Sequence, residues 1–111
     1  MAALYAPGPS RAELDVMPGA VVVQFGTDRC DWCQAAEPLI ANALADFPNV
    51  ALIRIEDGRG RPTGRSFGVK LWPTMIFLVG GHEVARVTRP ADARVISQAL
   101  AEMTDSAQSD G

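Results

Sequence analysis

Three stretches of the chain show hydrophobic patterns strong enough to predict secondary structure. Residues 21–25, Val-Val-Val-Gln-Phe, form a short β-branched run that is typical of a strand buried on both faces. Over residues 31–46 the apolar positions recur at intervals of three and four, which predicts an amphipathic helix with one core face. The same spacing over residues 90–103 predicts a final helix.

Further apolar runs complete a sheet. Residues 50–55 are expected to form a second buried strand, parallel to the first because a helix connects the two. Residues 75–79 and 83–87 are separated by the pair Gly80-Gly81, which indicates an antiparallel hairpin. A capping box of Ser10 and Glu13 predicts a short helix before the first strand. Another short helix is expected over residues 63–67.

The order of these elements predicts an α/β protein whose central mixed sheet of about four strands is flanked by helices on both faces. Its 111 residues are enough for one domain. We expect residues 1–9 to be a flexible N-terminal lead, because they hold Pro and Gly without periodicity. Residues 10–103 are expected to form the domain, and the polar residues 104–111 a disordered C-terminal tail.

Composition and charge narrow the classes of partner. The net charge of −3 argues against nucleic-acid binding. No apolar run reaches the roughly 18 residues of a membrane span, and the first residues lack the pattern of a signal peptide. We therefore expect a monomer in the cytoplasm with no membrane partner and no cofactor.

The chemistry of the chain is concentrated in the motif Cys30-Asp31-Trp32-Cys33, which holds both of its cysteines. Two sulfurs at this spacing can close a disulfide or supply half of a tetrahedral metal site. His82, the only histidine, is placed at the predicted hairpin turn, away from the motif. The two sulfurs and this distant imidazole are therefore a poor ligand set for a closed zinc site. Thiol redox chemistry is favoured, and no metal is expected.

Three features in this order resemble the thioredoxin superfamily over residues 21–100. They are the CxxC motif at the start of a helix interrupted by Pro38, the segment Phe-Gly-Val-Lys-Leu-Trp-Pro-Thr at residues 67–74, and the Gly80-Gly81 hairpin. The resemblance implies a thioredoxin-like fold and a thiol-disulfide oxidoreductase that reduces protein disulfides. It also implies that Cys30 is the attacking thiol, that Cys33 is the resolving thiol, and that Pro73 is a cis-proline facing them. A thioredoxin reductase or glutathione is the electron donor that such an activity implies.

The chain departs from the thioredoxin pattern around the motif. Arg29 replaces the usual Trp before the first cysteine, and Asp31-Trp32 replaces Gly-Pro between the cysteines. Gln24 stands where the family usually has a buried Asp, and Leu52 is assigned to the position of a nearby Lys. Because Gln24 cannot titrate, the resolving step is expected to use water or another carboxylate.

Neighbouring charges are expected to tune the attacking thiol. The N-terminus of a helix favours the Cys30 thiolate by roughly 0.3 to 2 kcal/mol. Arg29 acts in the same direction, whereas Asp31 opposes it by on the order of 1 kcal/mol. These contributions are of similar size, and we expect a reductase because no signal peptide is visible.

The substrate is expected to bind beside the motif. Trp32 and Trp72 offer stacking surfaces, and Thr74 with the backbone at Pro73 is positioned to hydrogen-bond an extended chain. An alternative of equal weight is that Trp72 caps the core and Trp32 is simply exposed.

Two other functions remain open from the sequence. A glutaredoxin-like, glutathione-linked activity would need a glutathione pocket, for which Thr74 and a basic loop are weak support. That loop carries Arg59, Arg61, Arg65 and Lys70, and a solvated charged face is the favoured interpretation. The last alternative is a redox-inactive interaction module in which Arg29 or Asp31 has detuned the thiols.

Overall fold

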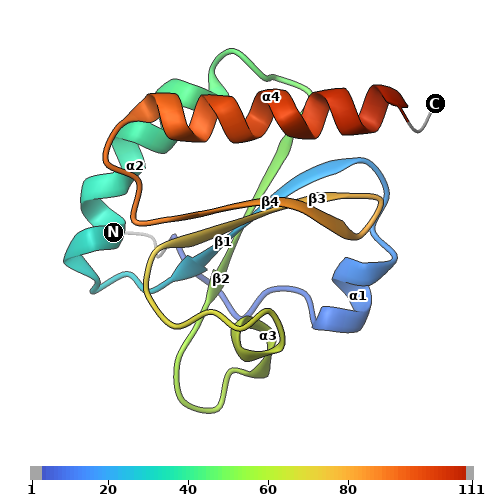
Figure 1. The fold of residues 1–111 in the computed structure, drawn as a ribbon. Helices are drawn as coiled ribbons and strands as arrows, with labels where there is room; N and C mark the ends of the chain where they lie inside the picture. The colour runs from blue at the N-terminus through green and yellow to red at the C-terminus, as the bar shows by residue number, and fades with distance from the viewer. Residues whose placement is uncertain (1–3, 110–111) are drawn as a thin grey trace.

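The computed structural model describes residues 4–109 and contains the predicted alternation of strands and helices (Figure 1). In chain order the elements are α1 (Arg11–Asp15), β1 (Ala20–Gly26), α2 (Asp31–Leu44), β2 (Ala51–Glu56), α3 (Pro62–Ser66), β3 (Thr74–Val79), β4 (His82–Thr88) and α4 (Ala93–Ser109). The capping box is present as predicted, since Ser10 and Glu13 bond each other's backbone N–H groups at the start of α1.

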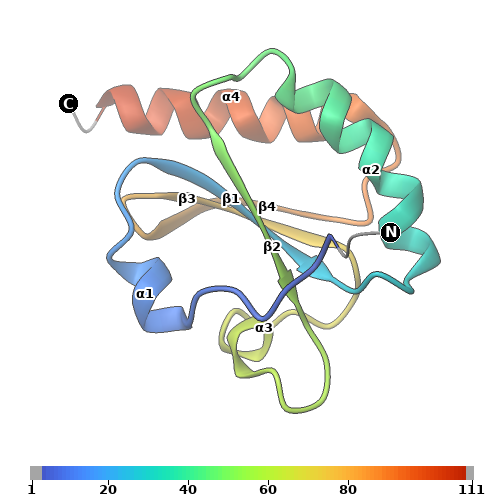
Figure 2. The same cartoon turned by 180° about the vertical axis from the view of Figure 1, so that it is seen from behind.

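The four strands form one mixed sheet in the order β2-β1-β3-β4. β1 pairs in parallel with β2 and antiparallel with β3, and β3 pairs antiparallel with β4. This confirms the mixed sheet and the glycine hairpin. It corrects one expectation, because β2 is an edge strand in which only Ile55 is fully buried. Its short apolar run is covered less well than that of the central strand β1 (Figure 2).

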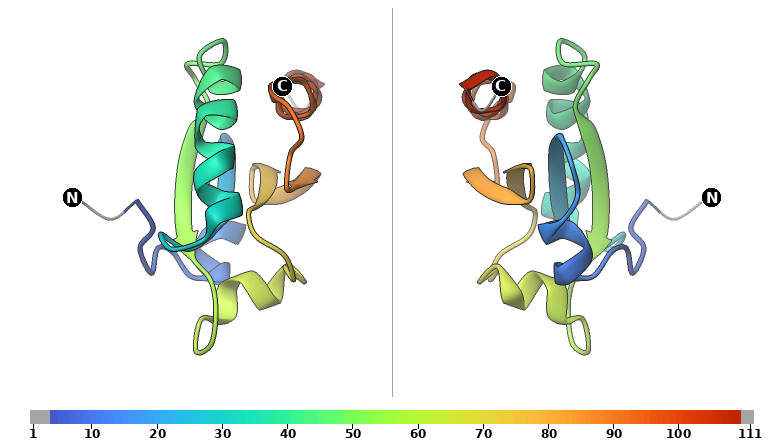
Figure 3. Two further views of the ribbon diagram at one scale, coloured as in Figure 1. Left: turned by 90° about the vertical axis from the view of Figure 1, so that its left-hand side faces the viewer. Right: turned by 90° about the vertical axis from the view of Figure 1, so that its right-hand side faces the viewer.

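Helices cover both faces of the sheet, as Figure 3 shows from the side. α2 and α4 pack on one face, against Val22, Met75 and Phe77. α1 and α3 lie on the other, where Leu14 and Phe67 meet Val23 and neighbouring strand residues. Because side chains alternate along a strand, Gln24 shares the face of Val22 and lies under α2, the helix that begins at the cysteine motif.

The segment before α1 is packed against the domain and is not a loose lead over residues 4–9. Tyr5 is only 4% exposed. Ala6 pairs with Ile55 at the free edge of β2, and its carbonyl accepts a bond from Glu56 N–H at 2.7 Å. Edge strands have unpaired backbone groups, which this segment satisfies where it runs along β2 (Figure 2). Residues 1–3 lie outside the described part of the chain.

The C-terminal tail also differs from the expectation. α4 continues to Ser109, so residues 104–109 are helical. Met103 is fully buried and Ala107 packs against the same core, so the apolar face of α4 extends beyond the predicted end of the helix. Residues 110–111 lie outside the described residues. Across residues 4–109, none of the helices has the length and hydropathy needed to cross a membrane.

Candidate functional site

The cysteine motif lies at the start of α2, just after the turn that follows β1. Cys30 is the N-cap residue of α2, and its sulfur accepts a hydrogen bond from the Cys33 N–H at 3.1 Å. The first N–H groups of a helix have no partner within the helix, so the sulfur takes the place of a capping oxygen. The Cys30 sulfur is therefore held by a direct backbone donor at the start of the helix.

The two cysteines are both reduced but differ in exposure. Cys30 is partly exposed, whereas Cys33 is 1% exposed beneath the first turn of α2. Burial first, and then the neighbouring Cys30, raise the pKa of Cys33 to about 12. A backbone hydrogen bond at Thr27 and the hydroxyl of Tyr5 act in the opposite direction. The structure thus holds Cys33 as a protected, protonated thiol behind an accessible one.

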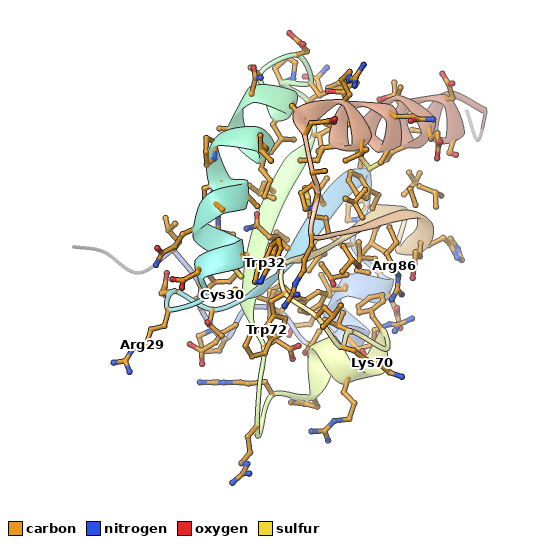
Figure 4. All side chains as sticks on the ribbon, turned by 60° about the vertical axis from the view of Figure 1, so that its left-hand side comes forward. Arg29, Cys30, Trp32, Lys70, Trp72 and Arg86 are labelled. Carbon is orange, nitrogen blue, oxygen red and sulfur yellow. The ribbon has the colours of Figure 1, made fainter. Side chains whose placement is uncertain are left out.

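The flanking charges lie at the surface. Arg29 and Asp31 are exposed, and the side chain of Arg29 extends away from the body of the protein (Figure 4). Charges in water are strongly screened, so their influence on Cys30 is smaller than that of the backbone N–H group in direct contact with its sulfur.

The start of α2, with the cysteine motif, forms one wall of the site. The segment before β3 forms the second wall. The Trp72–Pro73 peptide bond is cis, as the resemblance implies, and Pro73 is buried. Trp72 is anchored by its indole N–H, which donates to Asp57 Oδ2 at 2.8 Å. Thr74 is a correction to the expected substrate contacts. Its hydroxyl is buried, donates to the Leu71 carbonyl at 2.6 Å and lies 3.2 Å from the Thr88 hydroxyl, so its side chain is already engaged.

Arg89 connects the start of α2 with the segment before β3, and no pattern in the sequence indicated this role. Its guanidinium carbon lies 4.6 Å from the centre of the Trp32 ring, and its Nε donates to the Trp72 carbonyl at 2.9 Å. Its backbone N–H donates to the Pro73 carbonyl at 2.9 Å. Arg89 adopts a φ of 48°, which is uncommon for a residue other than glycine. Trp32 itself is 56% exposed, so a stacked cation and an indole form the surface beside Cys30.

A buried polar network lies behind Cys33. Gln24 Nε2 donates to the Tyr5 hydroxyl at 2.6 Å and to Glu37 Oε2 at 2.8 Å. The other carboxylate oxygen of Glu37 accepts from Arg54 at 2.6 Å. The partners of Gln24 are thus two side chains, from the segment before α1 and from α2. The sequence assigned the position of the basic partner to Leu52, whereas β2 places Arg54 in register with Gln24 and Leu52 with Val22.

Part of this network was detectable in the sequence. Glu37 lies four residues after Cys33 on the same helix face, and such pairs are neighbours in any α-helix. Tyr5 gave no such signal, because it precedes every predicted element. The network borders a cavity of about 20 Å³ lined by residues that include Tyr5, Cys33 and Glu37. A cavity of that size holds about one water molecule.

Within residues 4–109, no group of three or more His, Cys, Asp or Glu side chains is arranged to hold a metal ion. His82 starts β4 at the hairpin and is exposed.

Comparisons with known proteins agree on one family. Residues 11–102 match the family model described as Thioredoxin. Thioredoxin of Chlamydia pneumoniae is 28% identical over 82 residues, which span 74% of this chain and 80% of that protein. Thioredoxin-2 of Saccharomyces cerevisiae is 31% identical over 81 residues, which span 73% of this chain and 77% of that protein.

Solved structures extend the similarity to nearly the whole chain. The reduced form of thioredoxin 2 from Pseudomonas aeruginosa PAO1 has a TM-score of 0.83 and 48% sequence identity, and the match covers 95% of this chain and 99% of that one. The similarity therefore includes the sheet, the helices on both faces and the segment that carries the cysteine motif.

Proposed function

Because the chain belongs to the thioredoxin family and is a thiol-disulfide oxidoreductase with a CxxC motif, we propose that it reduces protein disulfides, with Cys30 attacking and Cys33 resolving. The contrast between the cysteines carries the proposal. Cys30 is accessible and its sulfur is hydrogen-bonded to a helix N–H, whereas Cys33 is buried behind it. The geometry gives the exposed sulfur the first contact with a large substrate.

The proposed reaction has two exchanges. The Cys30 thiolate attacks one sulfur of the substrate, so a Cys30–substrate bond forms, the substrate disulfide breaks, and the released substrate sulfur takes up a proton. Cys33 then loses its proton to water, and its sulfur attacks that of Cys30. The Cys30–Cys33 disulfide forms and the second substrate sulfur leaves and is protonated. The substrate gains two electrons and two protons, and the dithiol is oxidised.

The substrate is proposed to bind across Trp32, Trp72 and Pro73. The exposed indole of Trp32 supplies apolar contact area next to Cys30. Arg89 adds a positive charge to this surface, and a substrate strand pairing at the Trp72 carbonyl has to displace its Nε. These contacts favour an extended peptide with an acidic residue near its disulfide.

The electron donor, compartment and assembly are proposed from the same chemistry. A reductase must be returned to the dithiol after each turnover, so a thioredoxin reductase or glutathione in a reducing compartment such as the cytoplasm is required. A monomer suits the mechanism, because both cysteines and both walls of the site come from one chain.

A hollow beside Trp72 favours a second candidate, glutathione-linked activity. It has a volume of about 200 Å³, and its lining includes Arg61, Arg65 and Lys70, whose charges suit the carboxylates of glutathione. Arg61 is already paired with Glu56 at 2.9 Å, which lowers the free positive charge of the hollow. The protein-disulfide function remains the better supported.

A redox titration with a turnover assay tests the proposal. The protein is equilibrated in dithiothreitol and glutathione buffers, and the Cys30/Cys33 pair is followed by alkylation and mass analysis. Reduction of insulin disulfides at a strongly reducing potential supports the protein-disulfide function. Preference for a glutathione mixed disulfide over insulin supports the second candidate. Absence of any two-electron transition refutes both and leaves a non-redox interaction module.

A further inference from the structure

Tyr5 is placed to take part in the chemistry of the buried cysteine. It is the only tyrosine of the chain, and the proposed exchange reactions do not use it. The segment along β2 carries its side chain into the core, where it is 4% exposed. A hydroxyl that deep in a protein needs hydrogen-bond partners, so its neighbours show what it does.

The Tyr5 hydroxyl and the Cys33 sulfur both lie close to Gly26. A Cβ atom placed on Gly26 would lie 2.5 Å from Cys33 Sγ and 2.8 Å from the Tyr5 oxygen. Both atoms therefore occupy the space that a side chain at this last residue of β1 would fill. Glycine is required here for a close approach, since any larger residue would push the hydroxyl and the sulfur away from their positions.

Gln24 determines which way the hydroxyl hydrogen points. The Gln24 amide has two N–H donors, and it donates one to Glu37 and the other to the Tyr5 oxygen. The Glu37 carboxylate can only accept, which fixes the amide nitrogen on that side. The Tyr5 oxygen is thus an acceptor toward Gln24, and its own hydrogen is left for a different partner. Cys33 Sγ borders the same space beside Gly26 and is the candidate acceptor.

We propose that the Tyr5 hydroxyl donates a hydrogen bond to Cys33 Sγ and stabilises the thiolate that forms during the resolving step. The inference rests on the proposed roles of the cysteines. In this step the Cys33 proton passes to water, the Cys33–Cys30 bond forms, and the Cys30–substrate bond breaks. Tyr5 keeps its proton throughout. An uncharged donor, oriented by Gln24, thus assists the leaving of the Cys33 proton without accepting it.

The titration behaviour of the two groups agrees with this geometry. The hydrogen bond from Tyr5 lowers the pKa of Cys33, against the larger effect of burial. Burial first, and then the charge of Cys33, raise the pKa of Tyr5 above its usual value. Each group therefore influences the other, as thermodynamic linkage requires.

The main test compares Tyr5→Phe with the unaltered protein in single-turnover reduction of insulin. Acid quenching separates the mixed disulfide on Cys30 from the final Cys30–Cys33 product. We expect the first exchange to keep its rate and the resolving step to slow by roughly tenfold or more, because hydrogen bonds to charged groups are worth about 1.5 to 3 kcal/mol. The pH at which resolution accelerates should also rise. Ser66→Ala, which removes a hydroxyl at the last residue of α3, serves as the control and should change neither step.

Resolution at the original rate and with the original pH profile in Tyr5→Phe would overturn the proposal. A second measurement covers the case in which this variant folds poorly. Since Tyr5 is the only tyrosine, tyrosinate absorbance reports it alone, and Cys33→Ala should lower its pKa. An unchanged titration would refute the contact. The proposed function is tested separately, by trapping of the mixed disulfide in Cys33→Ser.

Discussion

The two cysteines of the motif have the same side chain and opposite surroundings. Cys30 lies at the surface, with its sulfur against a helix N–H and beside Trp32 and Arg89. Cys33 lies under the first turn of α2, next to Tyr5 and the polar network around Gln24. The outer half of the site is accessible to a substrate, whereas the inner half is buried and holds a protonated thiol. Position in the fold, and not the residue type, gives the two thiols their different surroundings.

The inner half of the site, around Cys33, also departs from the usual thioredoxin pattern. The carboxylate there is Glu37, which is held by Arg54 and Gln24 and lines the same small cavity as Cys33 and Tyr5. Its negative charge is balanced by the guanidinium of Arg54 at 2.6 Å. In our proposal the buried thiol is assisted instead by the Tyr5 hydroxyl, an uncharged donor.

The largest effect is expected when each cysteine sulfur is removed in turn. Cys30→Ser should abolish insulin reduction, since no accessible thiol is left to begin the exchange. Cys33→Ser should retain the first exchange and accumulate the Cys30–substrate mixed disulfide, which mass analysis detects. Matching far-ultraviolet circular dichroism of both variants controls for folding. Activity in Cys30→Ser would show that the assigned roles are reversed.

The second prediction concerns alkaline pH. The pKa of Cys33 is raised from 9.0 when unfolded to about 12 in the fold, so between these values only the unfolded chain has lost the proton. Between these values Cys33 should therefore contribute a fall in the stability of the reduced protein of roughly 1.4 kcal/mol per pH unit. Urea unfolding at several pH values measures this. The oxidised protein lacks the thiol and should show only the loss due to Tyr5, whose pKa is also raised.

A smaller effect is expected from neutralising the inner carboxylate. Glu37→Gln leaves the partly buried Arg54 without its charged partner and should lower the free energy of unfolding by about 1 to 3 kcal/mol. The rate at which Cys30 attacks substrate should stay the same, because Glu37 belongs to the other half of the site. Glu83→Gln is the matched control, since it breaks a more exposed pair with Arg86 and should cost about 1 kcal/mol or less. Equal losses in the two variants would contradict the distinction.

The smallest predicted effect is on the outer surface. Arg89→Gln removes the cation stacked on Trp32 and should raise the KM for substrates with an acidic residue near the disulfide by roughly two- to fivefold. Peptides that differ only in that residue, Glu or Gln, provide the measurement. The neutral peptide should respond less to the substitution. A uniform change for both would assign Arg89 a purely structural role at the Trp72 carbonyl.

The sequence by itself determined the elements and the motif. Residues 21–25 and 75–79 were apolar enough to predict the two central strands, and the cysteine spacing identified the reactive turn. Periodicity works there because each pattern is local and each element buries one or both faces. It failed where burial depends on partners, as in β2, which has the composition of a buried strand but lies at the edge of the sheet.

Only the tertiary structure decided which side chains surround the two cysteines. Tyr5 reaches Gln24 from 19 residues away and Arg54 reaches Glu37 from 17, while Arg89 crosses to the Trp72 carbonyl. None of these side chains lies in a periodic pattern that reveals its neighbour. Contacts between distant residues are selected by the packing of whole elements, whose relative positions follow from burial of the two cores rather than from local sequence. The surroundings that separate the two thiols therefore exist only once the chain has folded.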